Sequence, residues 1–455
     1  MTKIYSFLFG LICFGLSAQT VRDRQPLSLS LQEAVALGLE NNYSSIKSEK
    51  EVEKALSQKW EIISQGLPQI NAGVDYRNFL RQPVTLIPAT FTGGEEGTFE
   101  PVRFGTKQNL NATATWSQLI FDGSYIVGVQ SAKTLLQISK NAKTKTDLEV
   151  RKAVINAYGN VLIAKRSVEI LNSNLKNVTK NLNDTQQIFE NGLAEEEDVE
   201  QLKITRLTLN NNLGRSERML EIAYQMLNLA MGIPVEKEVK LTDELDGLAL
   251  KYSQPQLLDK TIPIEENIDV RIAENSAEAA RIFVRLEKAK ALPSITGFLN
   301  YGATGNSDSF SFFDNDQIYY SQSILGVSLN IPIFSSGMRI ARTKQKEMEY
   351  DQAILDLEQT RNEVKLEIAS AKADYRFSLE TLEARQESLT LAERIENKNQ
   401  IKFFEGLASS FELSEAQRQL YTAQQSLLEA MMNVISAKVE LENALSTKTY
   451  SEEEE

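Results

Sequence analysis

The sequence predicts an α+β protein in which one unit of short strands and very long helices occurs twice. Three observations favour this fold class: two long stretches lack proline, glycine recurs at one spacing in both, and four short segments alternate apolar and polar residues. No proline lies between Pro101 and Pro234, and none follows Pro332. Because proline inside a helix breaks it, these two stretches can hold long helices.

Landmarks in the two stretches follow the same order. Gly123 and Gly192 are separated by the same number of residues as Gly337 and Gly406. The flanking sequences also match: Ile120-Phe121-Asp122 with Ile333-Phe334-Ser335, Asn191-Gly192-Leu193-Ala194 with Glu405-Gly406-Leu407-Ala408, and Gly66-Leu67-Pro68-Gln69-Ile70 with Ala291-Leu292-Pro293-Ser294-Ile295. Such ordered agreement indicates an internal repeat, over about 27–232 and about 265–446.

The longest predicted helix covers residues 338–405, which contain neither glycine nor proline. At about 1.5 Å per residue it would extend roughly 100 Å. The returning helix has an unbroken seam in steps of three and four, at Leu413, Ala416, Leu420, Ala423, Leu427, Ala430, Val434, Ala437, Leu441 and Ala444. Such repeats specify helices that pair side by side. Taken alone, they also fit a purely structural coiled coil.

Strands are predicted near 69–79, 109–120, 294–303 and 322–332, where apolar and polar residues alternate. Runs of this length cross a membrane when tilted, with lipid on one side and water on the other. Tyr76, Trp116 and Tyr301 are candidate interfacial aromatics. Phe298 breaks the alternation and makes the third strand the weakest prediction.

Four strands are too few for a closed transmembrane barrel, since the smallest have about eight. Open edges in lipid would leave backbone groups unpaired. The chain is therefore expected to pool strands with copies of itself, and three copies in a ring supply twelve. The alternative is a soluble four-stranded sheet packed on helices, which explains poorly why a long helix follows both strand pairs.

Residues 1–18 have the features of a secretory signal: Lys3, an apolar run from Ile4 to Leu16, and small residues before Gln19. A lipid-acceptor role for Cys13 is an alternative. The mature chain, 19–455, is then expected to be a single elongated protomer that ends in an acidic tail, 451–455. No later stretch approaches the apolar length of a membrane helix.

Composition argues against most catalysis. The chain has no histidine, its only cysteine is Cys13, and its net charge is -13. These facts remove the usual general base, imidazole and thiolate metal sites, and a nucleic-acid partner. We expect no catalytic residue, no cofactor and no metal site. A carboxylate-based hydrolase is the remaining enzymatic alternative, but the acids lie on long amphipathic helices and not in a cleft.

Across nearly the whole mature chain, the sequence resembles the TolC-like outer-membrane factor (outer membrane efflux protein) family. The resemblance rests on the doubled Leu-Pro strand starts and Gly-Leu turns, the Phe-Asp-Gly strand end, and the opening helix, Leu27-Ser28-Leu29-Ser30-Leu31-Gln32-Glu33-Ala34-Val35 with Leu39-Glu40-Asn41-Asn42. It implies a trimeric 12-stranded outer-membrane β-barrel, four strands per chain, continuous with a long periplasmic α-helical barrel. The segment from about Pro234 to Pro263 would form a belt around the middle.

The resemblance also implies a function: a passive channel-tunnel that exports small molecules or proteins and is gated at its periplasmic tip. Its partners would be a periplasmic adaptor, an inner-membrane transporter and outer-membrane lipid, with no nucleic acid. The competing hypothesis is a periplasmic coiled-coil scaffold or adaptor without a pore. The sequence does not encode the cargo. Loops 80–108 and 303–320, the latter rich in aromatic residues, would face outside the cell.

Site residues follow from the two Gly-Leu turns, which would form the inner mouth. We expect adaptor contacts at Gly192, Leu193, Ala194, Gly406, Leu407 and Ala408. The family's acidic residues six and nine positions after the second glycine correspond to Glu412 and Glu415, the expected pore constriction. The alternative is that these acids only complement the helix dipole.

A periplasmic gate is expected at Asp198 and Phe403. Asp198 matches a family aspartate that helps to hold the closed mouth. The family has a tyrosine where this chain has Phe403, and one member has a basic residue where this chain has Ala408. The closed-state contacts are therefore expected to differ here.

Overall fold

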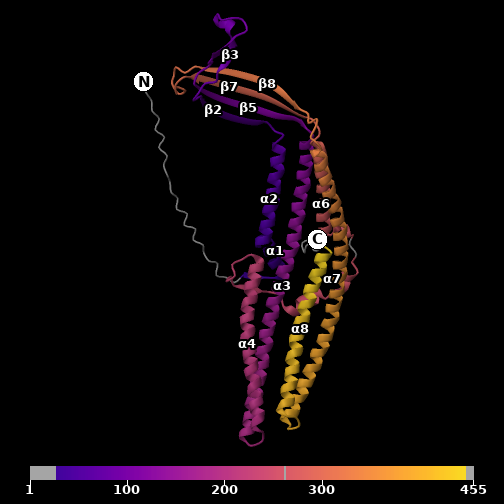
Figure 1. Cartoon of the computed structure of the whole chain (residues 1–455). Helices are drawn as coiled ribbons and strands as arrows, with labels where there is room; N and C mark the ends of the chain where they lie inside the picture. Colours follow the sequence, from indigo (N-terminus) through magenta and orange to yellow (C-terminus); the bar gives the residue numbers. More distant parts are fainter. Residues whose placement is uncertain (1–26, 261–262, 447–455) are drawn as a thin grey trace, which may run out of the picture.

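A computed structural model describes residues 27–260 and 263–446. The expected signal, 1–18, and the acidic tail, 451–455, lie outside these described residues. The molecule is elongated, with a curved sheet at one end and two helical hairpins that extend away from it (Figure 1). Each hairpin ends in a tight turn at the end of the molecule opposite the sheet.

The two halves of the chain share one order of main elements: a helix, two strands of the sheet, a very long helix and a shorter returning helix. The first half has α1 (Leu31–Asn41), α2 (Tyr43–Ser64), β2 (Gln69–Asn78), β5 (Gln108–Asp122), α3 (Gly123–Glu190) and α4 (Glu196–Met231). The second half has α6 (Ile268–Ala289), β7 (Ser294–Ser307), β8 (Tyr319–Asn330), α7 (Met338–Phe404) and α8 (Ser410–Ala444). The long helices α3 and α7 contain 68 and 67 residues.

The hairpins pack along the seams that the heptad pattern predicted. Leu413, Val434 and Leu441 of α8 are fully buried, and so is Tyr375 of α7. The main apolar core lies where both hairpins meet α1 and the belt, not at the tips. Within 27–260 and 263–446, no helix is both long enough and apolar enough to cross a membrane.

The belt consists of short elements that close on the long helices at mid-length. Strand β1 (Leu27–Leu29) pairs in parallel with β6 (Val239–Leu241), followed by α5 (Leu245–Tyr252) and the 3-10 turns η2 (Pro255–Leu258) and η3 (Ile264–Glu266). The Tyr158 hydroxyl of α3 donates to Asp243 Oδ2 at 2.7 Å. The Tyr375 hydroxyl of α7 donates to the carbonyl oxygen of Tyr252 at 2.7 Å. Each long hairpin is thus tied to the belt by a buried tyrosine.

The sheet is antiparallel, with strand order β2-β5-β7-β8. Directly opposite residues share a face, so Ile70, Trp116, Leu299 and Leu325 form one row across the apolar face. The other face carries polar cross-strand pairs, including Asn300 Nδ2 to Thr115 Oγ1 at 2.7 Å and Thr304 Oγ1 to Asn111 Oδ1 at 3.0 Å. Both edge strands, β2 and β8, lack a further partner among the described residues.

Phe298, the exception to the alternation, lies on the polar face opposite Gly326. A Cβ atom at Gly326 would lie 2.5 Å from Cζ of the Phe298 ring. Because Gly326 has no side chain, there is space at this position for the Phe298 ring. The third strand keeps its register because its partner strand supplies a glycine at this position.

Replacing Gly326 with valine should destabilise the sheet by about 1–3 kcal/mol, the usual cost of overpacking. The measurement is the heating temperature at which the folded, detergent-solubilised protein is lost on a gel. The double variant Gly326→Val with Phe298→Ala removes the ring and should recover most of the loss. An unchanged temperature for Gly326→Val alone would contradict this account of Phe298.

The loop between β2 and β5 contains a small hairpin that the sequence did not predict. It consists of β3 (Thr85–Pro88), the 3-10 turn η1 (Ala89–Thr92) and β4 (Phe99–Val102). The hairpin projects beyond the sheet, on the side away from the helices (Figure 1).

Candidate functional site

The two turns at the hairpin ends have the same backbone structure. Gly192 and Gly406 adopt φ values of 74° and 70°, in the left-handed region that favours glycine. In both turns the next residue donates its N–H back into the preceding helix, from Leu193 to Ile188 O and from Leu407 to Lys402 O. This bond is the mark of a Schellman helix ending. Both leucine side chains are left exposed to solvent, at 80% and 73%.

A cavity of about 520 Å³ lies between the two turns. Its lining brings together most of the predicted site residues: Leu193, Ala194, Asp198, Phe403, Gly406, Leu407, Ala408 and Glu412. Gly192 and Glu415 do not line it. The two halves of the chain thus build the tip jointly.

Asp198 connects the two hairpins. Its Oδ1 accepts a hydrogen bond from the backbone N–H of Ser410, the first residue of α8, at 3.3 Å. Its Oδ2 accepts from the N–H of Glu195 at 3.4 Å, within its own turn. The sequence predicted a gate role for Asp198 but not Ser410 as the partner. Phe403 offers no hydroxyl and instead packs edge-on against Phe404, with ring centroids 5.5 Å apart.

Glu412 and Glu415 lie at the start of α8, and both carboxylates already have partners within the chain. Glu412 Oε2 accepts from the Ser409 N–H at 2.9 Å and completes a capping box. Glu415 Oε1 accepts from Arg418 Nη2 at 2.5 Å. The hydrogen bonds from Arg418 lower the pKa of Glu415. Local helix capping and pairing therefore account for part of what these residues do.

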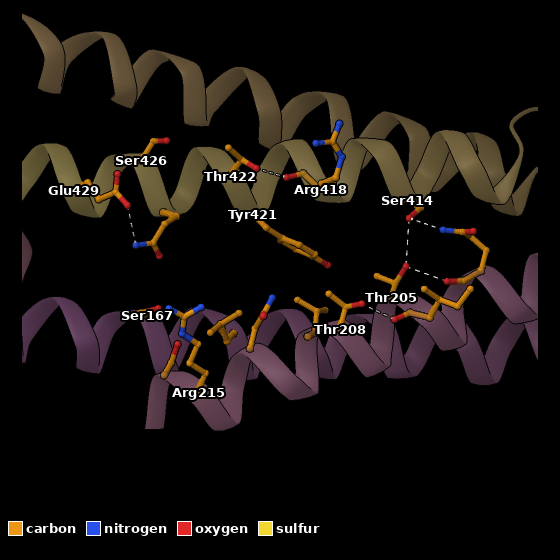
Figure 2. A pocket seen from close by; sticks show the side chains of 17 residues that line it. Ser167, Thr205, Thr208, Arg215, Ser414, Arg418, Tyr421, Thr422, Ser426 and Glu429 are labelled. Atoms are coloured by element: carbon orange, nitrogen blue, oxygen red, sulfur yellow. Dashed lines mark hydrogen bonds between the residues drawn. The ribbon is translucent and has the colours of Figure 1, made fainter. Parts of the chain in front are cut away.

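A polar groove of about 820 Å³ runs between α3, α4 and α8 above the tip (Figure 2). Ser414 of α8 lies 3.3 Å from both Gln201 Nε2 and Thr205 Oγ1 of α4. The Tyr421 side chain extends into the groove, and burial raises the pKa of its hydroxyl. The groove was not predicted from the sequence, although Thr205, Thr208 and Asn212 follow one another at helical spacing on α4.

The hairpins also contact each other through polar groups near the tip. Asn174 Nδ2 of α3 donates to Gln424 Oε1 of α8 at 2.9 Å, and Gln400 Nε2 of α7 donates to Asn181 Oδ1 of α3 at 3.2 Å. Hydrogen bonds of this kind contribute about 1 kcal/mol net each, because water replaces them when they break. The two hairpins can therefore separate at the tip at a lower cost than in the apolar core.

Glu396 of α7 has a carboxyl group that should make the stability of this region depend on pH. Burial raises the pKa of its carboxyl group, and the hydrogen bond from Gln417 only partly opposes the shift. The folded chain then takes up this proton more readily than the unfolded chain. The ionised carboxylate destabilises the fold at neutral pH, and the penalty fades as the pH falls through the raised pKa.

We expect Glu396→Gln to raise the unfolding temperature at pH 7 and to have less effect near pH 4. Thermal unfolding followed by circular dichroism at both pH values measures this. Glu393→Gln, an exposed site on the same helix, is the control. A Glu396→Gln effect that is equal at both pH values would contradict the pKa shift as its cause.

Within the described part of the chain, no group of three or more His, Cys, Asp or Glu residues could hold a metal ion. The features of the tip are thus a shared cavity, a hydrogen-bonded contact between hairpins, and exposed leucines.

Comparison with known proteins shows that the chain is similar to outer membrane efflux proteins. Residues 263–447 match the model of the outer membrane efflux protein family. The chain is 26% identical over 343 residues to outer membrane protein TolC of Vibrio cholerae, covering 74% of this chain and 77% of that protein. It is 23% identical over 462 residues to TolC of Escherichia coli, covering 98% of this chain and 87% of that protein.

The fold is similar to a solved structure of CusC, with a TM-score of 0.72 at 18% identity, covering 91% of each chain. The chain has the fold of the outer-membrane factor channels. These similarities support a TolC-like outer-membrane factor. The chain lies in the outer membrane with a periplasmic extension, and it is a channel of efflux or type I secretion, as the sequence predicted.

Proposed function

We propose that three copies of this chain form a passive channel by closing their sheets into one twelve-stranded barrel. The single observation that carries this proposal is the sheet itself. Its edge strands β2 and β8 have no partner strand on their outer sides in the described chain. They run in opposite directions, so β8 of one copy can pair with β2 of the next. Ring closure removes edges that lipid would not tolerate.

The faces of the sheet support the same conclusion. Large apolar side chains on one face stand in solvent in the single chain, with Ile70 at 75% and Leu325 at 78% exposed. The opposite face carries the polar cross-strand pairs. A barrel with lipid outside and water inside satisfies both faces.

The helices offer matching surfaces for ring closure. Helices α4 and α7 lie at the two sides of the helical layer, with α3 and α8 between them (Figure 1). Each carries exposed apolar residues along one helical face: Ile204, Leu207, Met219, Ile222, Met226 and Leu229 on α4, and Met348, Leu355, Leu366, Phe377, Leu391 and Ile395 on α7. We propose that α4 of one copy packs against α7 of the next. Helices α3, α4, α7 and α8 of the three copies then form a twelve-helix tunnel.

The tunnel is gated at the tip. In the closed state, Asp198 and the Ser414 contacts hold the two hairpins of each copy together, and Phe403 lines the wall of the tip cavity. Opening separates the hairpins. The exposed Leu193 and Leu407 next to Gly192 and Gly406, with Ala194 and Ala408, are the contact points for a periplasmic adaptor. The adaptor connects the channel to an inner-membrane transporter.

The test is to extract the folded protein in detergent, determine its mass, and reconstitute it in planar bilayers. We expect a trimer and discrete channel conductance. A folded monomer without conductance would instead fit the periplasmic scaffold and overturn the channel assembly.

The double variant Glu412→Gln with Glu415→Gln should weaken cation selectivity and block by divalent cations. Three copies would otherwise place six carboxylates around the inner mouth, which attract cations. The measurement is the reversal potential across a salt gradient in planar bilayers. Glu358→Gln, an exposed site far along α7, is the control. Unchanged selectivity would leave both acids with only the capping and pairing roles described above.

A further inference from the structure

The loop that joins β7 and β8 folds over the apolar face of the sheet. Tyr76 lies opposite Leu110, Leu110 opposite Gly305, and Gly305 opposite Tyr319. Residues directly opposite one another in an antiparallel sheet share a face. Since side chains alternate along a strand, Tyr76 continues the apolar face that carries Ile70. Because Tyr76 and Tyr319 both lie on the apolar face, a loop that contacts them covers that face.

Two phenylalanines of the loop, Phe310 and Phe312, pack on this face. Phe312 is 3% exposed, and its Cδ1 lies 3.3 Å from the place of a Cβ atom at Gly305. A hydrogen bond also holds the backbone of Phe312 in place, because the Tyr319 hydroxyl donates to the Phe312 carbonyl oxygen at 2.6 Å. Phe310 stacks edge-on against both Tyr76 and Phe312, with ring centroids 5.7 Å apart in each case. The aromatic cluster thus crosses the sheet from β8 to β2.

The outer rings of the cluster remain uncovered. Phe310 is 61% exposed and Phe313, which packs beside it at 5.9 Å, is 84% exposed. The loop between β7 and β8 that carries them lies at the end of the sheet far from the helices (Figure 1). Since the helices extend into the periplasm, this end is the outer one.

The loop satisfies its own polar groups while it exposes these rings. Ser311 Oγ donates to Gln317 Oε1 at 3.0 Å, Gln317 Nε2 donates to the Ile318 carbonyl at 2.9 Å, and the Asp314 N–H donates to the Ser311 carbonyl at 3.0 Å. Unpaired polar groups would oppose contact with lipid. The loop also carries the charged residues Asp314 and Asp316, which are costly to bury in the hydrocarbon region.

We propose that loop 308–318 is a membrane anchor that inserts Phe310 and Phe313 into the outer leaflet, at the boundary between headgroups and acyl chains. The occupant is lipid because the exposed rings lie at the end of the same face of the sheet that exposes Ile70 and Leu325, which the proposed barrel turns toward lipid. This inference rests on the proposed barrel. Phenylalanine side chains can insert at this depth of a bilayer, since the apolar ring leaves water while nearby polar groups stay hydrated. The anchor would set how deep the barrel sits.

Spin labels on single cysteines test the anchor in the full-length protein with Cys13→Ser, reconstituted in dioleoyl-phosphatidylcholine vesicles. The labelled variants are Phe313→Cys on the loop, Val327→Cys on the apolar face, and Phe91→Cys on the projecting hairpin as a matched control. The measurement is accessibility to oxygen, which enters lipid, relative to a water-soluble nickel chelate. We expect the ratio at 313 to exceed that at 91 severalfold and to fall below that at 327.

Two results would overturn the anchor while leaving the barrel intact. One is a ratio at 313 equal to that at 91, with 327 still in lipid. The other is a label at 313 shielded from both reagents, which would mean that a neighbouring copy covers the ring. A label at 327 that lies in water would overturn the barrel itself and the anchor with it.

Discussion

Replacing Arg151 with methionine should lower the free energy of unfolding by about 3–5 kcal/mol. Arg151 of α3 is 4% exposed, and its Nη2 lies 2.5 Å from Glu442 Oε2 of α8. The pair joins the two halves of the chain at the end of α8 near the belt. The substitution would remove the Arg151 charge from beside the Glu442 carboxylate, whose side chain is only 15% exposed. Thermal unfolding of the detergent-solubilised protein, followed by circular dichroism, measures the loss.

Two controls separate this effect from general damage. Lys50→Met breaks an exposed ion pair with Glu53 and should cost less than about 1 kcal/mol. The double variant Arg151→Met with Glu442→Leu removes both charges and should recover much of the stability, since well-packed apolar residues can replace a buried pair. If Arg151→Met behaves like Lys50→Met, the pair is not a structural tie between the repeats.

Asp198→Ala should shift the tip toward its open form. The carboxylate accepts hydrogen bonds from the N–H groups of Ser410 and Glu195, one across the hairpins and one within the turn. A hydrogen bond to a charged group is worth about 1.5–3 kcal/mol, so its loss changes the ratio of open to closed tips by about ten- to hundredfold per copy. The measurement is the resting conductance in planar bilayers, which should rise.

The control for this prediction is Glu197→Ala, which removes a neighbouring exposed acid of the same helical turn. It changes the charge at the mouth equally but breaks no contact between the hairpins. Equal conductance in the two variants would show that charge, not the Asp198 contact, controls the mouth. Ser410→Pro removes the N–H donor itself and should resemble Asp198→Ala if the contact is the lock.

The parts of the fold that could be predicted from the sequence are those that depend on the spacing of residues near one another in the chain. Helices and strands each impose one period on the sequence, so the seam of α8 and the alternation of β2 can be recognised from residue spacing alone. The doubled Gly-Leu turns indicated the family, which the comparisons confirm. The projecting hairpin β3–β4 was not predicted, because its short strands, Thr85–Pro88 and Phe99–Val102, carry no extended alternation.

For the candidate site, the sequence predicted the residues but not the atoms that they contact. Asp198, Glu412 and Glu415 were predicted by counting residues from the turn glycines, following the pattern of the family that the sequence resembles. Such counting cannot identify the hydrogen-bond partners of these side chains. The structure pairs Glu415 with Arg418, which lies three residues further along the same helix, a spacing at which side chains meet. That pairing could have been anticipated from the sequence.

By itself, the sequence predicted the repeat and the order of the main helices and strands, because both follow from residue spacing along the chain. It predicted the class of channel from its resemblance to the outer membrane efflux proteins. Only the tertiary structure decided which atoms meet across it. Asp198 accepts from Ser410, 212 positions away, because two hairpins of matched length bring their ends together. Phe312 covers Gly305 on the apolar face because strand register, not composition, fixes the side on which a loop folds.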